Sequence, residues 1–195
     1  MATLSTFKQK IGYGLRPNLF RVTIPTAGTA VQAAGEYDEV ADQFSFLCRS
    51  AGIPASTVGT VEVPFRGRVI KLPGDRTFES WTITVMADED LALRAFFEQW
   101  MDRLNKHDDG AGFTAGSEYA ATLQVDQLAR TATSGTADTD PHKIIRTYQF
   151  LNAFPSNLAQ IDLAYDNNNS IAEYTVEFQY DYWTVENSVG TQALS

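Results

Sequence analysis

The sequence predicts a mainly β fold, an antiparallel β-sandwich or barrel with one flanking α-helix at about residues 88–106. Apolar and polar side chains alternate in about eight segments rich in β-branched and aromatic residues, which is the pattern of half-buried strands. Only residues 88–106 combine length with apolar residues at spacings of three and four. Apolar residues make up 44% of the 195 positions and aromatic residues 12%, enough for a single domain over residues 1–195.

The first part of the chain is expected to hold an arm, a loop and four strands. Residues 1–15 predict a flexible N-terminal arm, and residues 26–40 predict a long polar loop. Strands are expected over residues 19–25, 42–50, 57–63 and 66–72. The last two strands would form a hairpin or a bulged bend around Pro64 and Phe65.

The best-defined strand is expected at residues 78–86, after a turn at Gly74 and Asp75. Its residues divide into a core face of Trp81, Ile83 and Val85 and a hydroxyl face of Ser80, Thr82 and Thr84. In the helix that follows, Asp88 is the expected N-cap.

The last part of the chain predicts strands at residues 119–128, 143–151 and 171–183. Residues 130–141 predict a mobile hairpin tip, and residues 184–195 a C-terminal tail with little to bury. The alternation places Glu173, Glu177 and Asp181 on the polar face of the last strand. The predicted core of the whole chain comprises Phe44, Phe46, Trp81, Ile83, Val85, Phe96, Trp100, Val176 and Phe178.

Charge and composition exclude several functional classes. The 15 basic and 24 acidic residues give a net charge of −9, which disfavours binding to a phosphate backbone. Cys48 is the one cysteine, so an intrachain disulfide is excluded and a cysteine-based zinc site is disfavoured. No signal peptide or membrane-spanning run is recognisable, and a soluble chain made in the cytoplasm, without membrane insertion, is expected.

No arrangement of residues predicts catalysis. His107 and His142 lack the paired spacing of metal ligands, and the glycines between residues 110 and 116 precede a strand instead of opening a helix. Asp138 and Asp140 lack the spacing of a calcium loop. We therefore predict no enzyme activity, no metal and no cofactor.

Four basic residues, Arg66, Arg68, Lys71 and Arg76, lie close together in this otherwise acidic chain. One interpretation is an ordinary solvated hairpin. The other is a basic loop that docks against an acidic patch on another copy of the chain. Such a contact joins two different surfaces and can build rings or filaments.

Several short motifs occur in the order found in one protein family. They are Arg16-Pro17-Asn18-Leu19-Phe20, Gly74-Asp75-Arg76-Thr77-Phe78, Trp81-Thr82, Val85-Met86, Asp88-Glu89, Phe154-Pro155, residues 166–171 and Asp181-Tyr182-Trp183. Through them the chain resembles the tail-tube proteins of contractile-tailed bacteriophages, which are related to the tubes of contractile injection systems. It departs from shorter members at residues 26–40, at residues 130–141 and after Trp183.

The resemblance implies a β-sandwich subunit in the virion tail, assembled in the host cytoplasm. Hexameric rings would stack into the hollow tube inside a contractile sheath, with sheath, baseplate and tail-terminator proteins as partners, and would support sheath assembly. Six copies with four strands each would close a 24-stranded barrel with a backbone diameter of roughly 48 Å, about 38 Å clear of side chains. A DNA duplex could pass through this lumen without specific binding.

The resemblance also suggests roles for two groups of residues. Glu173, Glu177 and Asp181 become candidates for the lining of the lumen, with an ordinary solvated outer face as the alternative. Arg66, Arg68, Lys71 and Arg76 become the candidate inter-ring stacking loop. Two alternatives remain open: the tube of a phage-derived injection machine that carries protein, and a tube-initiator or baseplate protein of the same fold. An enzyme is a third alternative, which the missing catalytic arrangement disfavours.

Overall fold

The computed structural model describes residues 3–11, 14–32, 37–113, 115–132, 142–166 and 170–187. Within them, seven strands form one hydrogen-bonded network in the order β1-β6-β7-β8-β5-β2, with β9 paired to β7, and two further strands form a separate hairpin. The strands of the network are β1 Phe20–Ala27, β2 Cys48–Ala51, β5 Trp81–Met86, β6 Ala121–Ala132, β7 His142–Leu158, β8 Glu173–Gln179 and β9 Tyr182–Asn187. The predicted mainly β, antiparallel fold is confirmed.

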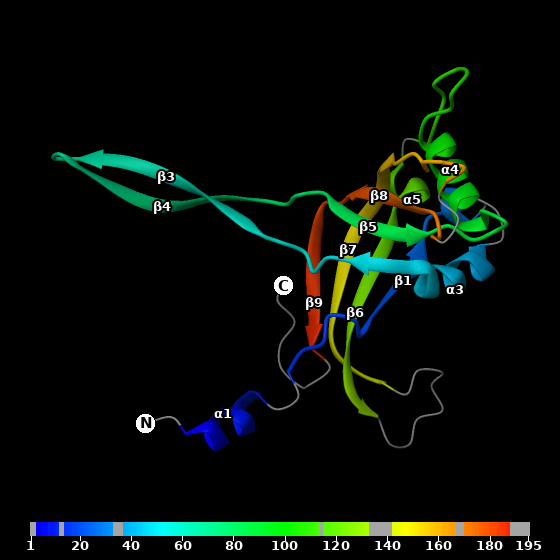
Figure 1. The fold of residues 1–195 in the computed structure, drawn as a ribbon. Helices are drawn as coiled ribbons and strands as arrows, with labels where there is room; N and C mark the ends of the chain where they lie inside the picture. The colour runs from blue at the N-terminus through cyan, green and yellow to red at the C-terminus, as the bar shows by residue number, and fades with distance from the viewer. Residues whose placement is uncertain are drawn as a thin grey trace.

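The long strand β7 divides this network into two sheets. Its first part pairs with β6 and β9, and its last part, from Phe154 to Leu158, pairs with β8. We call β1, β6, β7 and β9 sheet A, and β2, β5, β8 and the end of β7 sheet B. In Figure 1 the strands of sheet A run almost at right angles to β5 and β8, which is the orthogonal arrangement of a sandwich.

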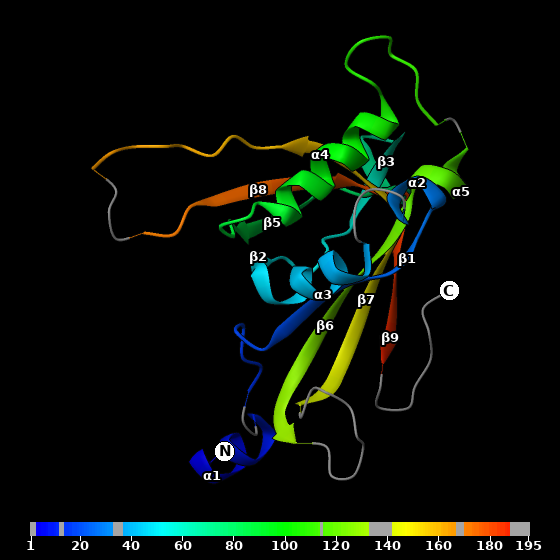
Figure 2. The ribbon, with the colours of Figure 1, turned by 90° about the vertical axis from the view of Figure 1, so that its right-hand side faces the viewer.

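Helices lie beside the two sheets. The helices are α1 Leu4–Ile11, α2 Thr29–Gln32, α3 Tyr37–Leu47, α4 Ala92–Leu104 and α5 Gly116–Tyr119. Helix α4 matches the predicted helix, and its Leu93, Phe96, Phe97 and Trp100 are buried. Helix α3 packs against β1 and α4, so both helices close the angle between the sheets (Figure 2).

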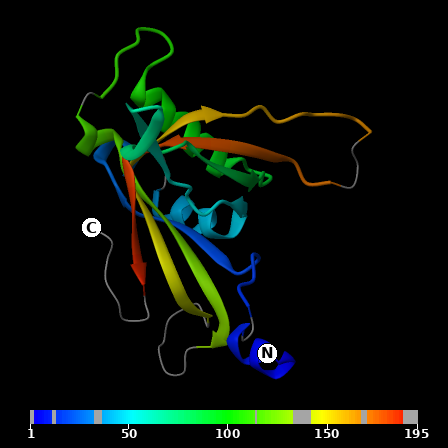
Figure 3. The same cartoon turned by 90° about the vertical axis from the view of Figure 1, so that its left-hand side faces the viewer.

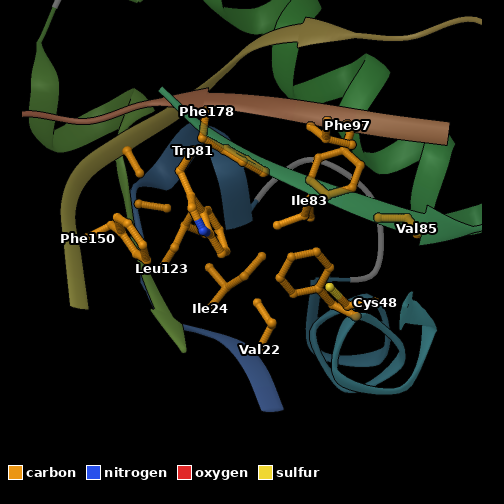
Figure 4. Packing of buried hydrophobic residues seen from close by; sticks show 14 of the residues in the cluster. Val22, Ile24, Cys48, Trp81, Ile83, Val85, Phe97, Leu123, Phe150 and Phe178 are labelled. Atoms are coloured by element: carbon orange, nitrogen blue, oxygen red, sulfur yellow. The ribbon is translucent and has the colours of Figure 1, made fainter. Parts of the chain in front are cut away.

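Aromatic rings connect the two sheets and the helices in one core (Figure 4). Trp81 of sheet B stacks on Phe150 of sheet A with ring centroids 4.5 Å apart. Phe97 of α4 meets Phe178 at 5.9 Å and Phe44 of α3 also at 5.9 Å. Eight of the nine predicted core residues are buried, and Phe46 is the exception.

The predicted strand at residues 42–50 is wrong. Helix α3 runs to Leu47, and only then does β2 begin at Cys48. Neighbouring positions in a helix are about 100° apart, so Phe44 and Phe46 point in nearly opposite directions instead of sharing a face. Phe44 is fully buried, whereas Phe46 is 80% exposed.

The predicted turn at Gly74 and Asp75 is also wrong, because both residues lie within a strand of the separate hairpin. This hairpin consists of β3, Thr57–Phe65, and β4, Arg68–Thr77. Its turn is formed by Arg66 and Gly67, which have φ values of 45° and 80°, the positive pair of a type I′ turn. A Cβ on Gly74 would lie 3.1 Å from the Gly59 carbonyl oxygen, so glycine permits a close approach of the two strands there.

Other boundaries differ from the prediction at both ends of the chain. The N-terminal arm contains α1, and the expected loop at residues 26–40 contains α2 and the start of α3. The expected C-terminal tail begins inside β9, where Val185 is 2% exposed. Residues 133–141 of the predicted tip and residues 188–195 lie outside the described residues.

The expected N-cap of α4 is likewise displaced. Leu91 occupies the cap position with φ 51°, and Asp88 instead accepts a bond on Oδ2 from the Ala92 amide at 3.3 Å. Asp88 therefore still satisfies an amide in the first turn of the helix, although it lies three residues before the cap position.

Replacement of Gly28 by alanine is expected to destabilise the protein by about 1–3 kcal/mol. A Cβ on Gly28 would lie 2.2 Å from the carbonyl oxygen of Glu118, and the Gly28 amide donates to the Ala120 carbonyl at 2.9 Å. Urea unfolding followed by circular dichroism measures the change. Gly52→Ala is the control, because no heavy atom lies within 4 Å of its added Cβ; equal effects of the two variants would contradict this expectation.

Candidate assembly surfaces

The hairpin of β3 and β4, which we call the arm, extends away from both sheets (Figure 1) and is seen nearly end-on in Figure 3. In the described residues its two strands pair only with each other. Nine residues of β3 at about 3.3 Å each give the arm a length of roughly 30 Å. An isolated two-stranded hairpin is marginally stable in water, so we expect the arm to be stabilised by packing against another surface.

One face of the arm is apolar. Directly paired residues of antiparallel strands lie on the same face, and this face carries the pairs Val61–Leu72, Val63–Ile70 and Phe65–Arg68. Its large apolar side chains are between 40% and 57% exposed. A contiguous exposed apolar surface of this kind indicates a protein contact site. The alternation of Val61, Val63 and Phe65 is a signal in the sequence from which this face could have been predicted.

The four predicted stacking residues all belong to the arm. Arg66 lies in the turn, with its guanidinium 5.4 Å from the centroid of the Phe65 ring, and Arg68 begins β4. Lys71 faces Glu62 across the strands at 3.7 Å, an exposed ion pair that contributes little to stability. Arg76 lies near the base of the arm. The structure thus brings the four residues onto one projecting element, which is a hairpin and not a loop.

Two of the three predicted lumen residues share the free face of sheet B. Glu173 and Glu177 point away from the core on β8, and Glu177 pairs with Thr82 of β5. Glu173 forms an ion pair with Arg49 of β2. The placement of Asp181 on this face is wrong, because β8 ends at Gln179 and Asp181 lies in the following bend.

Asp181 instead connects the bend to sheet A. Its Oδ2 accepts a bond of 2.7 Å from the Asn152 side-chain amide, and its backbone amide donates to the Leu151 carbonyl at 3.1 Å. These two hydrogen bonds fix the bend to β7, where the chain leaves sheet B and continues as β9 in sheet A. The alternation of the sequence continues through this break, so it does not reveal the change of sheet.

Sheet A has a buried carboxylate on its side away from the core. Asp126 is 0% exposed and accepts bonds from Arg21 Nη2 at 3.1 Å, from Thr147 Oγ1 at 2.7 Å and from Gln124 Nε2 at 2.9 Å. Its partners come from β1, β6 and β7, so the carboxylate fixes the register of three strands. A buried charge with this many partners is expected where strand pairing must be unique.

The described residues hold no group of three or more His, Cys, Asp or Glu residues that could bind a metal ion. His107 lies in a turn, and His142 begins β7. Cys48 is 7% exposed, and burial raises the pKa of its thiol to about 12. Among the described residues, no helix combines the length and apolar character needed to cross a membrane.

The fold is that of the tube subunits of contractile injection machines. A chain from the sheath-tube complex of an extracellular contractile injection system, PVC, superposes with a TM-score of 0.54 at 16% identity, with coverage of 95% of this chain and 99% of that chain. A chain from the sheath/tube terminator of the same kind of system gives 0.58 at 13% identity, with coverage of 90% and 99%. The TM-scores show a shared fold, and at identities this low the likeness extends to the fold alone.

The sequence comparison identifies the family. A family model described as phage tail tube protein matches residues 15–186, and the chain belongs to this family. It is 32% identical over 170 residues to the tail tube protein gp19 of Enterobacteria phage T4, with coverage of 86% of this chain and 90% of that protein. The tail tube protein of Serratia phage KSP90 is 25% identical over 183 residues, with coverage of 92% and 95%. The predicted resemblance is confirmed, and the protein is a structural component of the tail tube of a contractile phage tail.

Proposed function

We propose that this protein forms hexameric rings that stack into a hollow tube, through which the phage genome passes into the host. The observation that supports the stacking is the arm, because it presents an apolar face and basic residues, of which Arg66 and Arg68 lie at its far end, away from the acidic body. Contact between arm and body of different copies joins two unlike surfaces, which is the geometry of rings and filaments. The role is structural, with no catalytic step.

We propose that the free face of sheet B lines the lumen. Sheet B contributes four strands, the number that six copies need for a 24-stranded barrel of roughly 48 Å diameter. This face carries hydroxyl groups with Glu173 and Glu177, and Arg49 is the one basic residue in the paired segments of its strands. A neutral to acidic wall lets a polyanion slide without sticking.

Sheet A suits the lumen less well, although it too has four strands. Its strands carry further basic residues, Lys143 and Arg146 among them, which would attract the phosphates of a passing duplex. We therefore place sheet A, together with α3 and α4, towards the outside of the tube.

Sheath, baseplate and tail-terminator proteins are the proposed partners of the tube. The structural relatives come from a sheath-tube complex, a sheath/tube terminator and a tube-terminating cap of the anti-feeding prophage. A likeness to a chain of the anti-feeding prophage baseplate, with a TM-score of 0.53, leaves a tube initiator as the second candidate. The 32% identity to a phage tail tube protein favours the repeating tube subunit over the initiator, and genome over protein cargo.

Replacement of Glu177 by arginine is expected to produce filaments of normal shape that retain short duplex DNA. The added cations would line the proposed lumen and hold phosphates, and the retention should fall steeply as salt rises. Co-sedimentation of labelled DNA with filaments at several salt concentrations measures it. Glu186→Arg on the exposed part of β9 is the matched control, with the same change of charge on sheet A. Equal retention by the two variants would contradict the assignment of sheet B to the lumen.

A further inference from the structure

A groove on the part of the surface that the structure describes has a mainly apolar lining and an acidic edge. It lies between the start of α4 and the connection from β7 to β8, and its volume is about 730 Å³. The apolar lining consists of Ala87, Leu91, Ile161, Leu163, Ile171 and Ala172. Figure 2 shows the connection from β7 to β8 extending far from the sheets. A groove of this size can hold a few side chains of a partner.

The apolar side chains of the groove are unusually exposed. Leu163 is 89% exposed and Ile171 66% exposed. Leu91 has a positive φ of 51°, a strained backbone for a bulky residue, and its side chain is 40% exposed at the same groove. Exposed apolar residues that converge from three segments form a docking surface.

The edge of the groove is negatively charged. Asp88 and Glu89 belong to it, and no basic residue other than Arg94 lines it. The Arg94 guanidinium is already engaged, since Nε donates to Glu98 Oε1 at 2.9 Å and Nη1 donates to the Ala159 carbonyl at 3.0 Å. The groove therefore fits an apolar side chain flanked by cations.

The turn of the arm has this chemistry. Phe65 is 57% exposed, Arg66 follows it in the turn with its guanidinium 5.4 Å from the ring centroid, and Arg68 is its pairing partner on β4. We propose that the turn of the arm of one copy occupies the groove of a second copy, with Phe65 against Leu163 and Ile171 and the two arginines against Asp88 and Glu89. This inference rests on the proposed stacking function and names the surface that receives the arm.

The geometry of one copy favours a contact between different copies. The arm points to one side in Figure 1, whereas the connection from β7 to β8 extends sideways only in the views turned by 90°. The turn of the arm and the groove thus face different directions on the same molecule. The arm of each copy can bind one neighbour while its groove binds another. A contact of this kind builds either a filament or a closed ring.

Helix α1 of a second copy is the competing occupant. Its Leu4, Phe7 and Ile11 are exposed at helical spacing, and Lys8 lies beside them. The arm matches the groove better, because an exposed aromatic ring next to two arginines fits an apolar groove with two carboxylates at its edge. A cross-link from Lys8 of α1 or from Val69 of the arm to the groove separates the two occupants.

Cross-linking of assembled filaments tests the contact directly. Val69 and Asp162 lie next to the proposed contact without being part of it, and both are exposed. The double variant Val69→Cys/Asp162→Cys, treated with a short bis-maleimide, is expected to give a ladder of covalent multimers. Cys48 is buried with a raised pKa, so its thiolate fraction stays low and it contributes little background. The matched control, Val69→Cys/Gln99→Cys, moves the second thiol to the exposed face of α4 and is expected to give no ladder.

The outcomes distinguish this inference from the proposed function. Filaments of normal length without the Val69–Asp162 product overturn the inference and leave the stacking function standing. A ladder from Lys8→Cys/Asp162→Cys in place of the arm pair assigns the groove to α1 and also overturns it. A protein that stays monomeric without any substitution contradicts both the stacking function and the inference.

An exchange of charges gives an independent test. Arg68→Glu and Glu89→Arg are each expected to raise the protein concentration needed for polymerisation roughly tenfold, because like charges then meet in the groove. The combination of both changes restores the opposite charges and is expected to recover most of the loss. A combined variant as impaired as the worse single variant overturns the proposal, whereas Arg68→Glu combined with Glu186→Arg is the control expected to show no recovery.

Discussion

Reversal of Arg66 and Arg68 to glutamate is expected to leave a folded, soluble protein that no longer polymerises. Both residues lie at the end of the arm, outside the core, so the substitutions remove no buried contact. They convert the end of the arm from basic to acidic in a chain whose net charge is already −9. Repulsion between the arm and the body of the next copy then replaces attraction.

Sedimentation and electron microscopy measure the loss of polymerisation, and circular dichroism verifies the fold. The matched control is Lys106→Glu/Lys143→Glu, which changes the net charge by the same amount at exposed positions outside the arm. The control is expected to polymerise. Filaments of normal length from the Arg66/Arg68 variant would show that the arm does not mediate stacking through its charge.

Replacement of Trp81 by alanine is expected to cost about 3–5 kcal/mol of the free energy of unfolding. Trp81 is 4% exposed, stacks on Phe150 of the other sheet and donates from Nε1 to the Gly52 carbonyl at 2.7 Å. Its removal opens a cavity between the two sheets and leaves that carbonyl without this donor. A typical domain has only about 5–15 kcal/mol of stability, so much of the total would be lost.

Urea unfolding of the Trp81 variant is best measured in the Arg66/Arg68 background, where assembly does not add to the apparent stability. Phe46→Ala is the matched aromatic control, because Phe46 is 80% exposed in one copy. Its effect is expected to stay within about 0.5 kcal/mol. A Phe46 variant as destabilised as the Trp81 variant would mean that α3 is placed wrongly.

The strands at the centre of the fold are predictable from sequence because one of their faces is buried. Trp81, Ile83 and Val85 on β5 and Val176 and Phe178 on β8 alternate with polar residues, and the two strands pair directly. In both strands the residues of one face are buried and those of the other face are exposed or half-buried. The alternation of apolar and polar residues therefore fits a strand and no other element. For the same reason the helical spacing of Phe96 and Trp100 predicts α4 correctly.

Segment 42–50 was ambiguous because its apolar residues fit two periods. Phe44, Phe46 and Cys48 alternate as in a strand, but Val40, Phe44 and Leu47 are also spaced by four and three as in a helix. The structure follows the helical set, in which Val40 and Phe44 are buried. Packing against β1 and α4 decides between the two, and a local pattern does not contain that information.

The two assembly surfaces differ in how far the sequence reveals them. The basic residues of the arm lie close together in the chain, so the sequence alone reveals the basic cluster. The groove combines Leu91 with Leu163 and Ile171, which lie more than 70 residues further along the chain and meet Leu91 only after β7 and β8 pair beside α4. The polar alternation continues across the break between β8 and β9, so the sequence places Asp181 on the wrong sheet.

Electron microscopy of the purified, unsubstituted protein tests the central claim most directly. A tube subunit whose arm docks on the next copy is expected to form long, hollow filaments of uniform diameter at high protein concentration. A monodisperse monomer at the same concentration would contradict the account.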